Sequence, residues 1–344
     1  MARYLLSNTR KMGRCERRPN RKSLPYMATR DTRPFALLKM RATAFWRAAA
    51  LLCLACRLCL GQPSPSPYVA TTIAGGGLPS TPAAAASTPV VAPHSVVADS
   101  SGNLYYTAMN CVFQVDPGGT VTRVAGNSAS PGYSGDGGPA TSARFNNAQS
   151  LATDGTGYLY VTDAGNGTIR RIGPNGVITS LILNGRSAYF GVRSPLVNSN
   201  LDYPTAVAVD AFGQLYIAEP GAVLRIDARG ALSTIAGTGT PGDSGDGGPA
   251  ASAQVNSLAG IVADASGNVF IAESMGNRVR KIGTDGNITT VAGTGVAGYS
   301  GDGGPAAAAH LSYPSGLSAD RAGNLYIADT NNCAIRKVAT RSPP

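Results

Sequence analysis

Four acidic residues recur at nearly constant spacing and could form a ring of carboxylates. Each ends a short apolar run, and the intervals between them are 56, 54 and 56 residues. They are Asp163, Glu219, Glu273 and Asp329. Carboxylates on one face could hold a metal ion. Because an arginine (Arg170, Arg280 or Arg336) follows three of the four by seven residues, we favour structural ion pairs over a metal site.

A weaker copy of this pattern supports the ion-pair interpretation. It has Ala108 at the acid position and Phe113 at the arginine position, so acid and base are lost together. Glu219 is a partial exception, because Leu224 takes the arginine position and Arg225 follows it.

A second motif, Ser-Gly-Asp-Gly-Gly-Pro-Ala, occurs at residues 134–140, 244–250 and 300–306. Its aspartates, Asp136, Asp246 and Asp302, are candidate ligands for Ca²⁺, the one cofactor that the sequence suggests. One aspartate per loop is few for an ion that takes six to eight oxygens. We therefore favour a structural loop, in which glycines permit positive φ and proline starts a short Ala-rich turn.

These motifs belong to a unit that occurs five times. Each unit has an aspartate suited to an Asx-type turn, at intervals of 55, 56, 54 and 56 residues: Asp99, Asp154, Asp210, Asp264 and Asp320. In the last full unit, four short β-type runs are expected at 260–263, 269–272, 278–282 and 288–291. Four-strand units in series predict the blades of a β-propeller.

The ends of the repeat region predict how the ring closes. The fifth unit stops at residues 335–338 without a fourth run, while residues 71–75 match the fourth run at 289–293. We therefore expect an all-β propeller of five four-stranded blades, closed by the N-terminal strand. A six-fold or open ring is the alternative.

The last two units resemble NHL repeats. The resemblance is carried by residues 323–332 with Ile335-Arg336-Lys337, and by residues 267–273 with 277–282. It covers about residues 69–340 and is weakest in the unit at 95–124, which lacks the acid and the arginine. The NHL family implies a propeller, usually of six blades, but not one activity. Its members include extracellular sensor domains, RNA-binding modules and a zinc-dependent amidating lyase.

Function is expected where the units differ. The residue that begins each first run should rim the central channel: His94, Gln149, Thr205, Ala259 and Ser315. We take His94, Gln149, Thr205 and Ser315 as candidate ligand-binding residues. His94 is the histidine placed to act as a ligand or base. Zinc usually needs three or four protein ligands, and the chain has two histidines, so we assign no catalytic residue.

The net charge of +10 belongs to the leader. Residues 1–61 hold 14 Lys and Arg and two acids, which leaves 15 basic and 17 acidic residues after them. A net charge near −2 argues against nucleic-acid binding. The predicted organisation is a basic extension over 1–39, a signal-peptide-like segment over 40–61, a Pro/Ser linker over 62–68, the propeller over 69–340 and a tail over 341–344.

Export would leave two cysteines, Cys111 and Cys333. They could form one disulfide, although equivalent strands of adjacent blades are usually too far apart for it. The alternative is two free thiols.

The sequence thus predicts a secreted or periplasmic, monomeric propeller without a stable membrane anchor. Its expected role is non-catalytic binding of a protein or glycan through the face that carries the blade-to-blade connections. The alternative is a metal-dependent hydrolase or lyase at the channel mouth.

Overall fold

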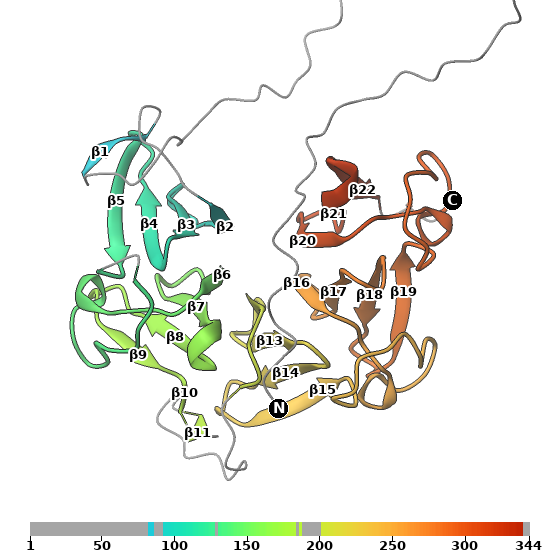
Figure 1. Cartoon of the computed structure of the whole chain (residues 1–344), viewed down its shortest axis with the longest axis horizontal. Coiled ribbons are helices and arrows are strands. Elements are labelled where there is room, and N and C mark those ends of the chain that lie inside the picture. Colours follow the sequence, from blue (N-terminus) through green and yellow to red (C-terminus); the bar gives the residue numbers. More distant parts are fainter. Residues whose placement is uncertain (1–81, 86–91, 128–129, 184–185, 188–200, 340–344) are drawn as a thin grey trace, which may run out of the picture. The chain divides into compact units, whose positions relative to one another are not determined.

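The computed structural model describes residues 82–85, 92–127, 130–183, 186–187 and 201–339. They form five antiparallel sheets whose first strands surround one central cavity, so the fold is an all-β propeller of five blades (Figure 1). The predicted blade number is confirmed. The expected leader, the linker and most of the tail lie outside the described residues.

Each blade is a meander in which consecutive strands pair. Blade 1 contains β2 (Pro93–Ala98), β3 (Leu104–Ala108), β4 (Cys111–Val115) and β5 (Thr120–Ala125). Blade 2 contains β6 (Ala148–Thr153), β7 (Leu159–Asp163), β8 (Thr168–Ile172) and β9 (Ile178–Ser180). Blade 3 contains β12 (Ala206–Val209), β13 (Leu215–Glu219), β14 (Ala222–Ile226) and β15 (Leu232–Ala236).

Blade 4 contains β16 (Leu258–Ala263), β17 (Val269–Glu273), β18 (Arg278–Ile282) and β19 (Ile288–Ala292). Blade 5 contains β20 (Pro314–Ala319), β21 (Leu325–Asp329) and β22 (Ala334–Val338). A small hairpin, β10 (Ile182–Leu183) and β11 (Arg186–Ser187), follows blade 2. The four runs predicted for blade 4 match its strands to within two residues.

Short 3₁₀ turns complete the structure. Three of them, η2 (Ala140–Ser142), η5 (Ala250–Ser252) and η6 (Ala306–Ala308), begin directly after a proline, as the Gly-rich motif predicts. Two others, η3 (Ala164–Asn166) and η7 (Thr330–Asn332), connect the second and third strands of blades 2 and 5. Among the described residues, no helix is long and apolar enough to cross a bilayer.

The hydrophobic core lies largely between blades. One buried cluster joins Val112 and Ala125 of blade 1 to Phe145, Leu151 and Val161 on the blade 2 side. Similar clusters join blades 3 and 4, and blades 4 and 5. Because every blade needs a neighbour to bury its face, the repeat is stable only as a series.

The predicted Asx turns are confirmed in all five units. Asp264 shows the pattern, since its Oδ1 accepts hydrogen bonds from the backbone N–H of Ser266 and Asn268 at 2.9 Å each. The other four aspartates accept the equivalent bonds. These turns fix the hairpins that connect the first strand of each blade, which lines the cavity, to the second.

Small polar residues join the innermost strands of successive blades. Ser95 Oγ accepts a hydrogen bond from the N–H of Leu151, and Ser150 Oγ accepts one from Val207, both at 3.1 Å. Thr205 Oγ1 continues the series by donating to the carbonyl of Leu258 at 2.6 Å. The small first-strand residues predicted around the axis therefore serve the contacts between blades.

Blade 5 has three strands among the described residues. The segment expected to complete it, residues 71–75, lies outside them, so closure by the N-terminal strand stays a prediction. An unexpected strand, β1 (Ala83–Ala84), pairs instead with β5 on the outer edge of blade 1.

The two cysteines of the propeller are not paired with each other. Cys111 is buried and is not part of a disulfide, whereas Cys333 is disulfide-bonded. The predicted alternative of a Cys111–Cys333 disulfide is therefore wrong, and so is the alternative of two free thiols.

Candidate functional site: a repeated arginine module and a loop face

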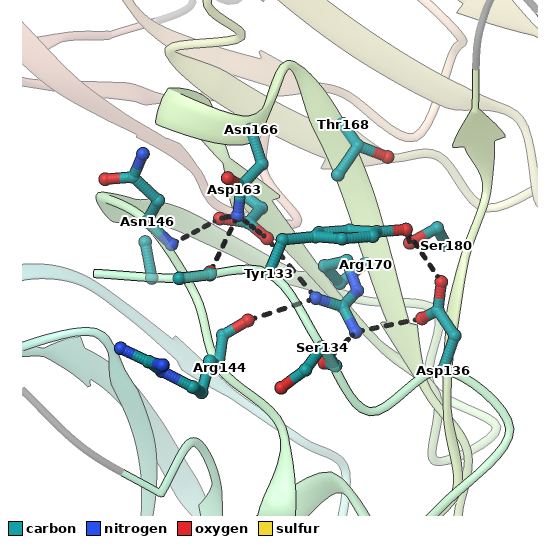
Figure 2. Close-up of polar contacts among 12 residues, drawn as sticks. Tyr133, Ser134, Asp136, Arg144, Asn146, Asp163, Asn166, Thr168, Arg170 and Ser180 are labelled. Atoms are coloured by element: carbon teal, nitrogen blue, oxygen red, sulfur yellow. Dashed lines mark hydrogen bonds and ion pairs between the residues drawn. The ribbon is translucent and has the colours of Figure 1, made fainter. Parts of the chain in front are cut away.

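A buried arginine organises the outer part of blade 2. The Arg170 guanidinium donates to Asp163 Oδ2 at 3.3 Å and to Asp136 Oδ1 at 2.8 Å (Figure 2). It also donates to the carbonyls of Ser134 and Arg144, at 3.0 and 3.3 Å. The second-strand acid and the Gly-rich loop aspartate are therefore partners of one cation, in what we call the arginine module.

The module recurs in blades 4 and 5. Arg280 contacts Glu273 Oε1 at 3.5 Å and Asp246 Oδ1 at 2.8 Å. Arg336 contacts Asp329 Oδ2 at 3.2 Å and Asp302 Oδ1 at 2.7 Å. The predicted pairing of second-strand acids with third-strand arginines is confirmed in these three blades.

The Gly-rich loops thus dock onto arginines 34 residues further along the chain. Gly135 must be glycine, because its φ is +97° and a Cβ there would lie 2.7 Å from the Cα of Ala143. Sequence reasoning missed this pairing, although the constant separation of 34 residues could have indicated it.

The three loop aspartates proposed as Ca²⁺ ligands each have this arginine contact. In the part of the chain that the structure describes, no group of three or more His, Cys, Asp or Glu side chains is arranged to hold a metal. Ca²⁺ binding by Asp136, Asp246 or Asp302 stays a prediction, and it would have to compete with the arginine.

Burial shapes the electrostatics of the module. The Asp163 side chain is fully buried, which raises its pKa, while hydrogen bonds from Asn166 and Asn146 and the charge of Arg170 lower it. Tyr133 lies over the guanidinium, with the Arg170 Cζ 4.9 Å from its ring centre. Its hydroxyl donates to Asp136 Oδ2 at 2.9 Å. Tyr299 covers Arg336 in the same way, at 5.0 Å.

Blades 1 and 3 show what replaces the module. In blade 1, Phe113 at the arginine position stacks on Tyr106 with ring centres 5.1 Å apart, so an aromatic core takes the place of the ion pair. In blade 3, Glu219 accepts a hydrogen bond from the N–H of Asp202 at 2.8 Å, and Leu224 stands opposite Ile217. A blade of this repeat can therefore form with or without the arginine module.

The channel-rim residues come together as predicted. A cavity of about 530 Å³ is lined by the first strands of all five blades, and its lining includes His94, Gln149, Thr205, Ala259 and Ser315. Register irregularities at the start of β2, β6, β16 and β20 fall at or beside four of these positions. Bulges at such places re-aim side chains. Ligand binding by His94, Gln149, Thr205 and Ser315 stays a prediction.

Two tyrosines that sequence reasoning missed stand beside this rim. Two residues before each rim position, the backbone has positive φ without glycine: at Ala92, Asn147, Tyr203, Ser257 and Tyr313. Such a conformation is unusual for a bulky side chain. Tyr203 and Tyr313 are 44% and 42% exposed, and the hydroxyl of Tyr203 accepts hydrogen bonds from the side chains of Asn147 and Gln149. The repeated Tyr-Pro dipeptide was the available indication.

The loops around these tyrosines share one face of the propeller. Asn110 Oδ1, between the second and third strands of blade 1, accepts from the N–H of Asn147 at 2.7 Å. Asn277 Oδ1 of blade 4 likewise accepts from the N–H of Tyr313 at 3.0 Å. The second-to-third-strand loop of one blade therefore contacts the chain that enters the next. We call the surface formed by these loops and the blade-to-blade connections the loop face.

Comparisons with known proteins agree with this architecture. A family model described as the NHL repeat matches residues 311–338. Teneurin-1 of Mus musculus is 31% identical over 233 residues, and Teneurin-4 of Homo sapiens is 31% identical over 237 residues. The matches cover 60% and 61% of this chain but 8% of each teneurin.

The chain is an NHL-repeat β-propeller. A solved structure similar to this NHL propeller is that of a protein of unknown function from Bacteroides thetaiotaomicron, with 20% identity and a TM-score of 0.48. The match covers 78% of this chain and 75% of that one. That likeness carries no information on what the NHL propeller binds.

Proposed function

We propose that this NHL propeller is an exported, non-catalytic binding module that recognises a protein or glycan through its loop face. The observation that carries the proposal is the distribution of exposed apolar side chains. Nine large ones are exposed among the described residues, and six of them lie in blade-to-blade connections or second-to-third-strand loops. They are Tyr133, Tyr203, Met275, Val296, Tyr299 and Tyr313.

The chemistry of this face suits recognition. Tyrosine supplies a large apolar contact and a hydroxyl at low conformational cost, and aromatic residues are enriched at interface centres. Four of the six exposed side chains are tyrosines. Tyr203 and Tyr313 are held in an uncommon backbone conformation at the rim, which is a feature of functional positions. The non-equivalent rim residues would supply the polar contacts that orient a ligand.

Export is proposed from the leader and not from the fold. Its basic residues precede an apolar segment that ends in small residues. A monomeric form belongs to the same proposal. Nucleic-acid partners are left out of it because the segment after residue 61 has a net charge near −2.

Binding to arrays of defined oligosaccharides and of purified secreted proteins tests the proposal. For any ligand found, the double variant Tyr203→Ala/Tyr313→Ala should lose at least tenfold in affinity. Phe212→Ala is the matched control, because Phe212 is 63% exposed in a hairpin turn outside the loop face. An affinity lost in Phe212→Ala and kept in the double variant would place recognition elsewhere. Turnover of a bound ligand that requires His94 would favour the hydrolase or lyase alternative.

A further inference from the structure

The arginine module of blade 4 departs from the other two copies at three neighbouring positions. Asp243 stands where blades 2 and 5 have Tyr133 and Tyr299. Glu273 replaces a second-strand aspartate, and Gly276 replaces the asparagine found three residues later. The arginine, the Gly-rich loop and its carbonyl contacts are unchanged. The three changes together alter one polar pocket beside Arg280.

The loss of the asparagine removes a hydrogen-bond donor. In blade 2, Asn166 Nδ2 donates to Asp163 Oδ1 and Oδ2 at 2.9 Å and to the carbonyl of Gly132 at 2.9 Å. In blade 5, Asn332 Nδ2 donates to Asp329 Oδ2 at 2.8 Å and to the carbonyl of Gly298 at 2.7 Å. Gly276 has no side chain to do this for blade 4.

One carboxylate oxygen is consequently left without a partner. The Glu273 side chain is fully buried, and its Oε2 accepts no hydrogen bond. Its Oε1 is occupied by Arg280 and by the N–H of Asn256 at 3.2 Å. A buried, unsatisfied oxygen is costly. Because the structure leaves this Glu273 oxygen unsatisfied, we expect it to bind a partner that the chain itself does not supply.

Oxygen atoms converge on the place that the asparagine would fill. From the position of a Cβ at residue 276, Asp243 Oδ1 lies 3.1 Å away and Glu273 Oε2 lies 3.4 Å away. Gly242 is the counterpart of Gly132, because its N–H donates to Val255 as the N–H of Gly132 donates to Phe145, so its carbonyl corresponds to the one that Asn166 contacts in blade 2. All three groups are acceptors, so the partner must be a donor or a cation.

We propose that this pocket binds a divalent cation, Ca²⁺, through the carboxylates of Asp243 and Glu273 and the carbonyl of Gly242. The donors are all oxygens, which suits a hard cation. Asp243 is exposed, so water can complete the six to eight ligands that Ca²⁺ takes. The site goes beyond the proposed function and does not depend on it.

The local charge favours a cation. Asp246 is already held by Arg280 and by the N–H of Thr290, at 2.8 and 2.9 Å. The pocket therefore holds two further carboxylates, that of Glu273, which Arg280 contacts, and that of Asp243. In blades 2 and 5 the corresponding arginine faces one, because a tyrosine replaces the second.

A proton on Glu273 competes with Ca²⁺ for this pocket. Burial raises the pKa of Glu273 to about 7; Arg280 and Arg278 lower it, and Asp243 raises it. Because a ligating carboxylate must be ionised, Ca²⁺ and the proton exclude each other.

Calorimetric titration of the EDTA-treated full chain with CaCl₂ at pH 8 tests the site. Wild type should bind one Ca²⁺, and Asp243→Asn should bind at least tenfold more weakly. The triple variant D243Y/E273D/G276N recreates the blade 5 arrangement and should bind none while keeping the wild-type Tm in EDTA or exceeding it. Asp285→Asn is the control, because Asp285 is an exposed carboxylate in a separate hairpin turn of the same blade and should leave binding unchanged.

Three results would overturn the site. One is a wild-type chain that binds no Ca²⁺ at millimolar concentration and pH 8. Another is Ca²⁺ binding that survives in the folded triple variant. The third is an affinity equally reduced by Asp285→Asn, which would indicate general surface charge. None of these results bears on the loop face, whose test uses other residues.

Discussion

At the residue scale, the arginine module replaces apolar packing with a buried, hydrogen-bonded ion pair. Arg170 has no exposed side-chain surface, yet it lies between the rings of Tyr133 and Phe145 and donates to four acceptors. A buried pair of this kind contributes little net stability over an apolar alternative, but removal of one partner leaves an uncompensated charge. Blade 1, with Phe113 in place of the arginine, shows that the repeat accepts the apolar alternative.

Arg170→Met should therefore destabilise the propeller by about 3–5 kcal/mol, because Asp163 would keep a buried charge without its partner. The double variant Asp163→Asn/Arg170→Met should recover much of this loss, since it removes both charges. Urea unfolding followed by circular dichroism measures both. Arg171→Met is the matched control, because the Arg171 side chain is less buried and lies over Tyr158. Equal losses in the single and double variants would contradict a charge-based penalty.

Glu273 gives the propeller a specific pH dependence when Ca²⁺ is absent. Its pKa of about 7 in the folded state lies above the ordinary value of 4.5. Between these values the folded state holds a proton that the unfolded state has released, so rising pH favours unfolding. The free energy of unfolding of wild type, relative to Glu273→Gln in EDTA, should fall from pH 4.5 to pH 7 and be level above it. Parallel pH curves for the two proteins would contradict the raised pKa.

At the element scale, the innermost strands set how closely blades approach. The position directly after each rim residue holds a small side chain or none: Ser95, Ser150, Ala206, Gly260 and Gly316. At Gly260 a Cβ would lie 2.0 Å from the carbonyl oxygen of Ser315, which is backbone and cannot move aside. At Gly316 the nearest atom would be 3.8 Å away. Two glycines at equivalent positions thus have different roles.

Gly260→Ala should destabilise the propeller and Gly316→Ala should not. The first substitution forces blade 5 away from blade 4, which costs packing in the core between them. We expect a loss of about 1–3 kcal/mol for Gly260→Ala and a change within about 0.5 kcal/mol for Gly316→Ala. Thermal unfolding of the two variants, compared with wild type, gives both values. Similar Tm values for the two variants would mean that the blades can separate without cost.

Most strands and turns could be predicted from the sequence, because the repeat shows the same pattern five times. Aspartate turns, strand runs and acid–arginine pairs at fixed spacing could all be predicted. The conformation of Tyr203 and Tyr313 could not, since positive φ normally indicates glycine and a residue before proline is usually extended. The contact between the Gly-rich loop and the arginine escaped prediction because it joins residues 34 apart through tertiary packing.

At the scale of the whole molecule, the first and last blades differ from the others. The first strands pack in series from β2 through β6, β12 and β16 to β20. The ends of the series carry exposed apolar residues, Val96 on β2 (64%) and Ile335 on β22 (71%). Among the described residues β22 pairs on one side only, with β21. An unpaired edge of this kind invites association with another strand.

We predict that residues 71–75 pair with β22 and complete blade 5. Under reducing conditions, truncation after residue 61 should leave the Tm unchanged, because it removes only the leader. Truncation after residue 76 should lower the Tm by several degrees and promote association, because β22 would then present a free edge. Thermal unfolding and light scattering of the two truncated proteins make the comparison directly. Equal Tm values and equal masses would show that blade 5 is stable with three strands, and that this propeller is an open ring.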